Sequence, residues 1–153
     1  MAAARPILPL RIGDLKLALP LDLVERVLPM VELDPLPGAP RHVVGTASVH
    51  GRIVPVVDLC QSLGLHGRDR SASDRLVLVR AGARPVALSV EDVEPVLYVA
   101  EDALAASDEM PGGLPQFDGM AWTGTGRVLI YDLAACLTAA DELRLSAALE
   151  ARS

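Results

Sequence analysis

The sequence predicts a mostly β protein built from two related halves that share one core. Hydrophobic residues make up 51% of the 153-residue chain, yet its aromatic residues are only Tyr98, Phe117, Trp122 and Tyr131. The core must therefore be built from Val, Leu, Ile and Ala, and branched aliphatic side chains favour strands. This length suits one domain, or two small barrels with a common core, rather than two independent domains. We expect a single domain over residues 1–153.

The first predicted elements are a hairpin and a further strand. Apolar segments at residues 7–11 and 15–21 are joined by Gly13-Asp14, and a short Gly-containing link between such segments is a hairpin signal. Residues 23–31 carry apolar side chains at several alternating positions, which predicts another strand. The prolines of residues 34–40 fix φ and cannot donate ladder hydrogen bonds. That stretch is predicted to be a loop.

The next strand leads into a predicted helix cap. Residues 53–57 are apolar, and Pro55 confines such a strand to a sheet edge or a bulge. Asp58 follows directly, so we expect it to cap a short helix, with Gln61 three residues later forming a capping box. Residues 64–73 are polar and contain glycine, which indicates a surface loop.

A second hairpin then restarts the pattern. Apolar residues 76–79 and 86–90 flank Ala81-Gly82-Ala83, which predicts two strands and a turn. At the end of the chain, residues 132–149 are rich in Ala and Leu and contain neither Pro nor Gly. They predict a C-terminal helix.

Two internal alignments indicate that the halves are duplicates. Residues 18–28 and 87–97 share six identities in eleven positions, and the Val54–Leu59 segment resembles the Val128–Leu133 segment, including its Asp-Leu end. Each half reads hairpin, strand, loop, strand and Asp-capped helix. Short strands with prolines fit a pair of small barrels, because barrel closure removes exposed sheet edges. We expect two subdomains over about residues 15–75 and 76–135, with terminal strands able to exchange between them.

Charge and hydropathy exclude some partners and places. The formal net charge is −6, whereas nucleic-acid binding depends on Lys and Arg that displace counterions, so we expect no nucleic-acid partner. No apolar run approaches the roughly 18 to 20 residues that span a bilayer, and residues 1–6 lack the apolar stretch of a secretion signal. We therefore expect a cytoplasmic protein without membrane insertion. Cys60 and Cys136 lie in apolar runs, where cysteine acts as a small buried hydrophobe.

Catalytic and metal-binding patterns are missing from the sequence. No nucleophile with a base, no carboxylate pair and no phosphate cradle is visible, so we expect no enzyme and no cofactor. His42, His50 and His66 with Cys60 lack the spacing that places two ligands on one ion, so we expect no metal. The enzymatic alternative would use His50 and Asp58, without a second converging polar cluster.

The segment over residues 36–59 carries a family resemblance. The loop Leu36-Pro37-Gly38-Ala39-Pro40 precedes Gly45-Thr-Ala-Ser-Val-His50-Gly51-Arg52, which runs into Ile53-Val-Pro-Val-Val-Asp58-Leu59. This pattern resembles the CheW family of chemotaxis coupling proteins, in which a proline-containing loop leads into Gly-Val-x-Asn-Leu-Arg-Gly and an apolar Pro-Val-x-Asp-Leu strand. The likeness covers nearly the whole chain.

The resemblance implies a fold and a role. The fold would be two five-stranded SH3-like β-barrels around a shared core, with short helices and a C-terminal helix. The role would be a non-catalytic adaptor that links the cytoplasmic tips of chemoreceptors to the regulatory domain of a CheA-type histidine kinase, with recruitment to membrane-associated receptor arrays. Candidate contact residues are the valines of an apolar groove and the polar edge of the motif: Val24, Val27, Val44, Ser48, Val49, His50 and Arg52. For the four valines, a plain core position is the competing interpretation.

The chain departs from the family pattern within its most informative motif. Ser48 stands where the family has Asn, and His50 stands where it has Arg. Arginine offers a permanently charged fork of five donors, whereas histidine offers one or two donors, so the partner contacted here can differ. Arg52 supplies a guanidinium on the same face only if no bulge intervenes. The alternative function is a CheW-like scaffold of another pathway, such as twitching motility or polar positioning.

Overall fold

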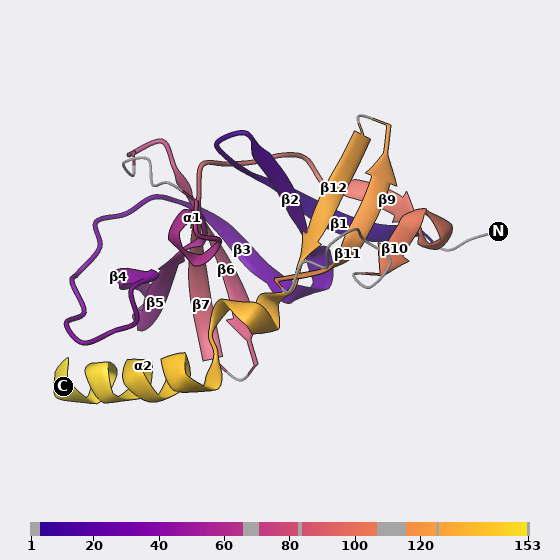
Figure 1. Cartoon of the computed structure of the whole chain (residues 1–153). Helices are drawn as coiled ribbons and strands as arrows, with labels where there is room; N and C mark the ends of the chain where they lie inside the picture. Colours follow the sequence, from indigo (N-terminus) through magenta and orange to yellow (C-terminus); the bar gives the residue numbers. More distant parts are fainter. Residues whose placement is uncertain (1–3, 66–70, 83, 107–115, 125, 153) are drawn as a thin grey trace.

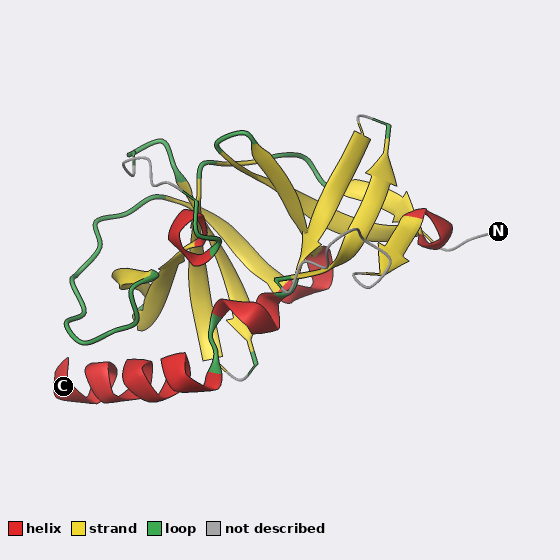
Figure 2. Ribbon diagram, in the orientation of Figure 1, coloured by secondary structure: helices red, strands yellow, loops and turns green. Residues whose placement is uncertain are grey.

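The computed structural model of the chain describes residues 4–65, 71–82, 84–106, 116–124 and 126–152. Its strands form two sheets that lie side by side in Figure 1, and the C-terminal helix α2 runs along one of them. Figure 2 shows that strands make up most of the molecule and that the helices are short apart from α2. The prediction of a mostly β protein is confirmed.

The first barrel is formed by a five-stranded sheet in the order β3-β6-β7-β5-β4. All of its strands come from the middle of the chain. Their bounds are β3 Val24–Pro29, β4 Val43–Val49, β5 Arg52–Asp58, β6 Arg75–Ala81 and β7 Arg84–Val90.

The second barrel is formed by a seven-stranded sheet in the order β10-β11-β12-β2-β1-β8, in which β9 also pairs with β1. Strands β8 and β9 contact β1 on either side of Pro95, which cannot donate a ladder hydrogen bond, so they are two parts of one interrupted strand. The bounds are β1 Ala4–Ile12, β2 Leu15–Pro20, β8 Asp92–Val93, β9 Leu97–Ala100, β10 Leu104–Ala106, β11 Phe117–Thr123 and β12 Gly126–Tyr131.

Both sheets contain the same five-stranded unit. The order β4-β5-β7-β6-β3 in the first barrel corresponds to β11-β12-β2-β1-β9 in the second. The parallel pairs also match, since Val56 lies opposite Ala87 in one barrel and Ile130 lies opposite Ala18 in the other. The two five-stranded units are confirmed, with β8 and β9 together taking the place of β3, and β10 is an addition that the sequence did not predict. Each barrel combines hairpins from both halves, so the strands of each sheet come from both of the ranges 15–75 and 76–135.

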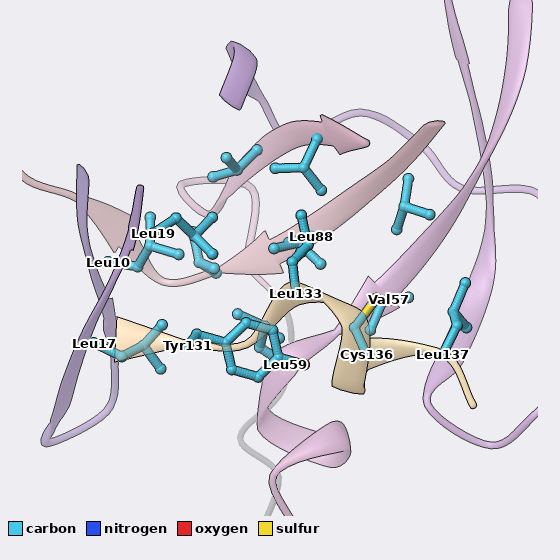
Figure 3. Packing of buried hydrophobic residues seen from close by; sticks show 14 of the residues in the cluster. Leu10, Leu17, Leu19, Val57, Leu59, Leu88, Tyr131, Leu133, Cys136 and Leu137 are labelled. Atoms are coloured by element: carbon cyan, nitrogen blue, oxygen red, sulfur yellow. The ribbon is translucent and has the colours of Figure 1, made fainter. Parts of the chain in front are cut away.

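The hydrophobic core has three parts. One cluster fills the first barrel around Val54 and Leu76, and another fills the second barrel around Ala18 and Val128. The largest cluster joins the barrels. In Figure 3, side chains from the second barrel meet side chains from the first barrel and from the segment after β12: Leu10, Leu17, Leu19, Val57, Leu59, Leu88, Tyr131, Leu133, Cys136 and Leu137. The predicted shared aliphatic core is therefore confirmed.

Strand β5 is internal, so of the two settings predicted for Pro55, a sheet edge or a bulge, the sheet edge is wrong. Strand β5 lies between β4 and β7. Thr46 lies opposite Pro55 in β4. The Thr46 N–H donates to the Asp34 carbonyl at 2.8 Å, and the Thr46 carbonyl accepts from the Asp34 N–H at 2.9 Å. Both backbone groups of Thr46 therefore point away from β5, and Pro55 does not have to donate a hydrogen bond to Thr46. The pairing with β7 begins only at Val56. A register shift between Val43 and Gly45 also lies in the paired strand β4.

The predicted aspartate caps are both present. The side chain of Asp58 accepts a hydrogen bond from the Cys60 N–H at 2.9 Å and caps α1, Leu59–Ser62. Its own N–H donates to the carbonyl of His42 at 2.8 Å, so the predicted capping box with Gln61 is wrong. Asp132 accepts from the Ala134 N–H at 3.1 Å and caps the 3-10 helix η4, Leu133–Cys136. Within the described part of the chain, the other 3-10 helices are η1, Leu21–Leu23, and η2, Glu101–Ala103.

The C-terminal helix begins later than the predicted range 132–149. Helix α2 spans Ala139–Arg152, after the break that separates it from η4. Thr138 and Asp141 cap it reciprocally: the Asp141 N–H donates to Thr138 Oγ1 at 3.1 Å, and the Thr138 N–H donates to Asp141 Oδ2 at 2.9 Å. Among the described residues, no helix is long and apolar enough to cross a bilayer.

Candidate partner-binding site

The β4–β5 hairpin places His50 at the end of the first barrel. Val49 and Arg52 are paired, so His50 and Gly51 form a two-residue turn. Their φ angles of 50° and 80° are both positive, as a type I′ turn requires. Histidine is one of the few residues other than glycine that adopt this region comparatively often. The turn leaves the His50 side chain exposed to solvent.

Side-chain contacts connect this turn to strand β3. A guanidinium nitrogen of Arg26 contacts Nε2 of His50. The carboxylate of Glu25 lies 3.7 Å from the Arg52 guanidinium and 3.5 Å from the Arg80 guanidinium. Strands β3 and β4 are the two ends of the sheet order, so these contacts help to close the barrel. We call these five residues the tip surface.

A bulge explains why neighbouring residues of β3 both reach the tip surface. The register with β6 shifts between Val24 and Arg26, and Glu25 is the extra residue. A regular strand would turn successive side chains to opposite faces. The side chains of Glu25, Arg26 and Val27 are all exposed instead.

The contact between Arg26 and His50 defines the proton arrangement of the imidazole. A guanidinium carries only donors, so Nε2 of His50 must be the acceptor. The ring proton of neutral His50 is then on Nδ1.

The structure brings some of the sequence-predicted residues together and separates others. Ser48, His50 and Arg52 are exposed at the hairpin, and Val27 is 40% exposed on β3 next to Arg26. Val49 is 5% exposed and packs inside the first barrel. Val24 is half-buried against the shared core, and Val44 is half-buried against the interior of the first barrel.

Sequence reasoning missed four residues of this region. Ile53 is 50% exposed and lies opposite Ser48, a position that strict alternation along β5 could have indicated. Glu25, Arg26 and Arg80 reach the tip through barrel closure, for which the sequence contains no local signal.

A second concave region lies beside the C-terminal segment. We call this open hollow of about 630 Å³ the junction groove. It separates the β6–β7 hairpin from η4 and the start of α2. Arg84 crosses it and donates to Glu142 at 3.0 Å and to Ser146 at 3.1 Å. The lining is otherwise mostly small or apolar: Ala81, Gly82, Pro85, Ala134, Leu137 and Ala139.

The residues of the enzymatic alternative do not form a site. Asp58 ends β5, and His50 lies in the turn before its first residue, Arg52. The six residue steps from Arg52 to Asp58, of about 3.3 Å each, therefore place the His50 turn roughly 20 Å from Asp58. Asp58 is buried as a helix cap. Within the described ranges, no three His, Cys, Asp or Glu side chains are grouped to hold a metal ion, and His66 lies outside those ranges. Burial raises the pKa of the Cys136 thiol to about 12, so this thiol is protonated at neutral pH.

Comparison with known proteins agrees with this architecture. The family model described as a CheW-like domain matches residues 6–141. The chain is 28% identical to the chemotaxis protein CheW of Thermotoga maritima over 125 residues, which is 82% of each chain. It is 25% identical to the chemotaxis protein CheW of Rhizobium meliloti over 97 residues, which is 63% of each chain and less than two thirds of that protein's length. The scaffolding protein TtCheW from Thermoanaerobacter tengcongensis has a similar fold, with a TM-score of 0.82, 22% identity and coverage of 92% of this chain and 96% of that chain.

Proposed function

The chain belongs to the CheW-like domain family, and from this membership we propose that it is a non-catalytic adaptor linking chemoreceptors to a CheA-type histidine kinase. The observation that carries the proposal is the family match over residues 6–141, which includes both barrels. The names of two relatives, the chemotaxis proteins CheW of Rhizobium meliloti and Thermotoga maritima, support the same pathway.

An adaptor needs two separate surfaces, and this chain has two candidates. The tip surface and the neighbouring Ser48, Val27 and Ile53 offer charged and apolar contacts at one end of the first barrel. The junction groove lies beside the β6–β7 hairpin, between that hairpin and the segment formed by η4 and the start of α2. We assign the receptor tip to the tip surface and the kinase regulatory domain to the apolar part of the junction groove, because apolar anchors with a polar rim are typical of protein interfaces. Val24, Val44 and Val49 stay predicted contact residues.

The first test measures each interaction separately. The purified chain should capture a receptor cytoplasmic tip and a CheA-type regulatory domain in a pull-down from purified components. Circular dichroism of the same preparation shows whether the chain is folded. A folded chain that captures neither partner would contradict the adaptor proposal.

A second candidate function follows from His50. Its imidazole is engaged by Arg26, whereas the family's arginine at this position would repel that guanidinium. This local change favours a CheW-like scaffold of another pathway, such as twitching motility or polar positioning. The discriminating variant is His50→Arg, with recruitment to chemoreceptor clusters as the readout. Recruitment that appears only in the variant supports the second function, and recruitment of the unaltered chain supports the first.

A further inference from the structure

The tip surface carries an excess of positive charge in an acidic protein. It holds the guanidinium groups of Arg26, Arg52 and Arg80, together with the imidazole of His50. The carboxylate of Glu25 faces both Arg52 and Arg80. The whole chain has a formal net charge of −6, so this surface departs in sign from the rest of the molecule.

Arg26 is the least neutralised of these groups. Its described contact is Nε2 of His50, and an imidazole carries no negative charge that could balance the guanidinium. A guanidinium has five donors in a planar fork that matches a carboxylate. The geometry therefore leaves Arg26 suited to an anionic group from outside the chain.

We propose that the tip surface binds an acidic protein segment, with a carboxylate of the partner placed at Arg26. This inference rests on the proposed adaptor function and names the chemistry of the partner at one of its two surfaces. A second carboxylate reaches Arg52, which shares Glu25 with Arg80 and is itself about half exposed. An apolar side chain between these carboxylates contacts Val27 or Ile53, which are 40% and 50% exposed.

Charge complementarity favours an acidic protein segment over a nucleic acid. A nucleic acid presents a phosphate every few ångströms, and the chain's overall negative charge would repel the phosphates beyond the tip surface. A short acidic segment places its charges only where the arginines are. The exposed apolar side chains on either side of these charges also suit a peptide better than a sugar-phosphate backbone.

The test uses two peptide probes and the full chain labelled with ¹⁵N. One probe is a 20-residue helical peptide with a central Leu and Glu residues one turn before and after it, and the other has Gln in place of every Glu. Chemical-shift titration is recorded for the unaltered chain, Arg26→Gln and Arg127→Gln. Both substitutions remove one positive charge, but Arg127 is an exposed residue of β12 in the second barrel. A 20-nucleotide single-stranded DNA is titrated in parallel.

The expected result is selective and local. The Glu peptide binds about fivefold more tightly than the Gln peptide, a size that corresponds to one or two exposed charge pairs. Its shifts concentrate at Arg26, Val27 and residues 49–53. Arg26→Gln weakens the preference for the Glu peptide, whereas Arg127→Gln keeps it. Equal binding of the two peptides, equal losses in the two variants, or stronger binding of the DNA would overturn the inference.

The peptide titration and the pull-down can fail independently. A chain that captures a receptor tip or a kinase domain but does not distinguish the Glu peptide from the Gln peptide refutes the acidic-partner inference alone. A chain that selects the Glu peptide but captures neither protein refutes the adaptor proposal, and the acidic specificity of the tip surface stands.

Discussion

Gly45 lies where strand β4 passes close to the backbone of Asp34. A Cβ at this position would be 2.5 Å from the Asp34 carbonyl oxygen, which belongs to the bridge between Asp34 and Thr46. A backbone atom cannot move aside as the end of a flexible side chain can. The close approach therefore explains why the motif has glycine here.

We predict that Gly45→Ala destabilises the protein by about 1–3 kcal/mol, because the strand or the Asp34 segment must shift. The measurement is the midpoint of urea unfolding followed by circular dichroism. Gly124→Ala is the matched control, since a Cβ at Gly124 would meet nothing within 4 Å. Equal midpoints for Gly45→Ala and the unaltered chain would show that the bridge moves without cost.

Tyr131 gives the stability of the protein a dependence on alkaline pH. Its side chain is fully buried in the shared core, where its ring packs edge-on against Phe117 with centroids 6.0 Å apart. Burial raises the pKa of Tyr131 from 10.0 to about 12. Between these two values the unfolded chain loses the phenolic proton and the folded chain keeps it, so stability falls as pH rises.

We predict that Tyr131→Phe reduces the loss of stability between pH 10 and pH 12. One such group contributes at most about 1.4 kcal/mol for each pH unit in this window. Unfolding free energies measured by urea titration at pH 9, 10 and 11 provide the comparison. Tyr98→Phe serves as control, because Tyr98 is 72% exposed. If Tyr98→Phe and Tyr131→Phe flatten the curve equally, burial of Tyr131 is not the cause.

At the residue scale, the sequence predicts contacts only where they are local. Ser48, His50 and Arg52 are grouped by the motif itself, so their common exposure at the hairpin could be anticipated. Arg26 is 24 positions from His50 along the chain. Only closure of the barrel brings the two together, and no periodicity within either segment encodes that contact.

Helix α2 is held against the first barrel by one narrow face. Leu145 and Ala148 are buried in the shared core, whereas Leu143 is 76% exposed on the same helix. Polar contacts fix both ends: Arg84 binds Glu142 at the start, and Arg152 lies 3.4 Å from Asp34 at the finish. These contacts make α2 part of the first barrel's wall.

We predict that Leu145→Ala lowers the unfolding free energy by about 2–5 kcal/mol, the range for a buried leucine that leaves a cavity. Leu143→Ala removes the same atoms from an exposed position of the same helix and should change stability by less than about 0.5 kcal/mol. Thermal and urea unfolding of the two variants give the comparison. Similar losses in both would mean that α2 contributes through helix propensity rather than through packing.

At the element scale, the sequence predicts hairpins well and pairing across the chain poorly. The β1–β2 and β6–β7 hairpins follow from two-residue and short turns, whose geometry is encoded locally. The parallel pairing of β5 with β7 decides that Pro55 lies in an internal strand, and it depends on the fold of both halves. The break before α2 had a local signal, the Thr138-x-x-Asp141 cap, within a segment rich in helix-forming residues.

At the scale of the whole molecule, the two halves of the sequence form two barrels that share strands and a hydrophobic core. Each barrel takes a hairpin from each half of the sequence, and the largest buried cluster lies between them. The tip surface and the junction groove therefore lie on one structural unit with a shared core. A unit with two binding surfaces is suited to hold two partners at once.

The central claim is that one copy of this chain binds both a receptor tip and a kinase regulatory domain. The most direct measurement is size-exclusion chromatography with multi-angle light scattering on the three purified components. We predict one species that contains all three proteins, and loss of only the receptor tip from it in the Arg26→Glu variant. Two binary complexes that never combine, because each partner displaces the other, would contradict the account.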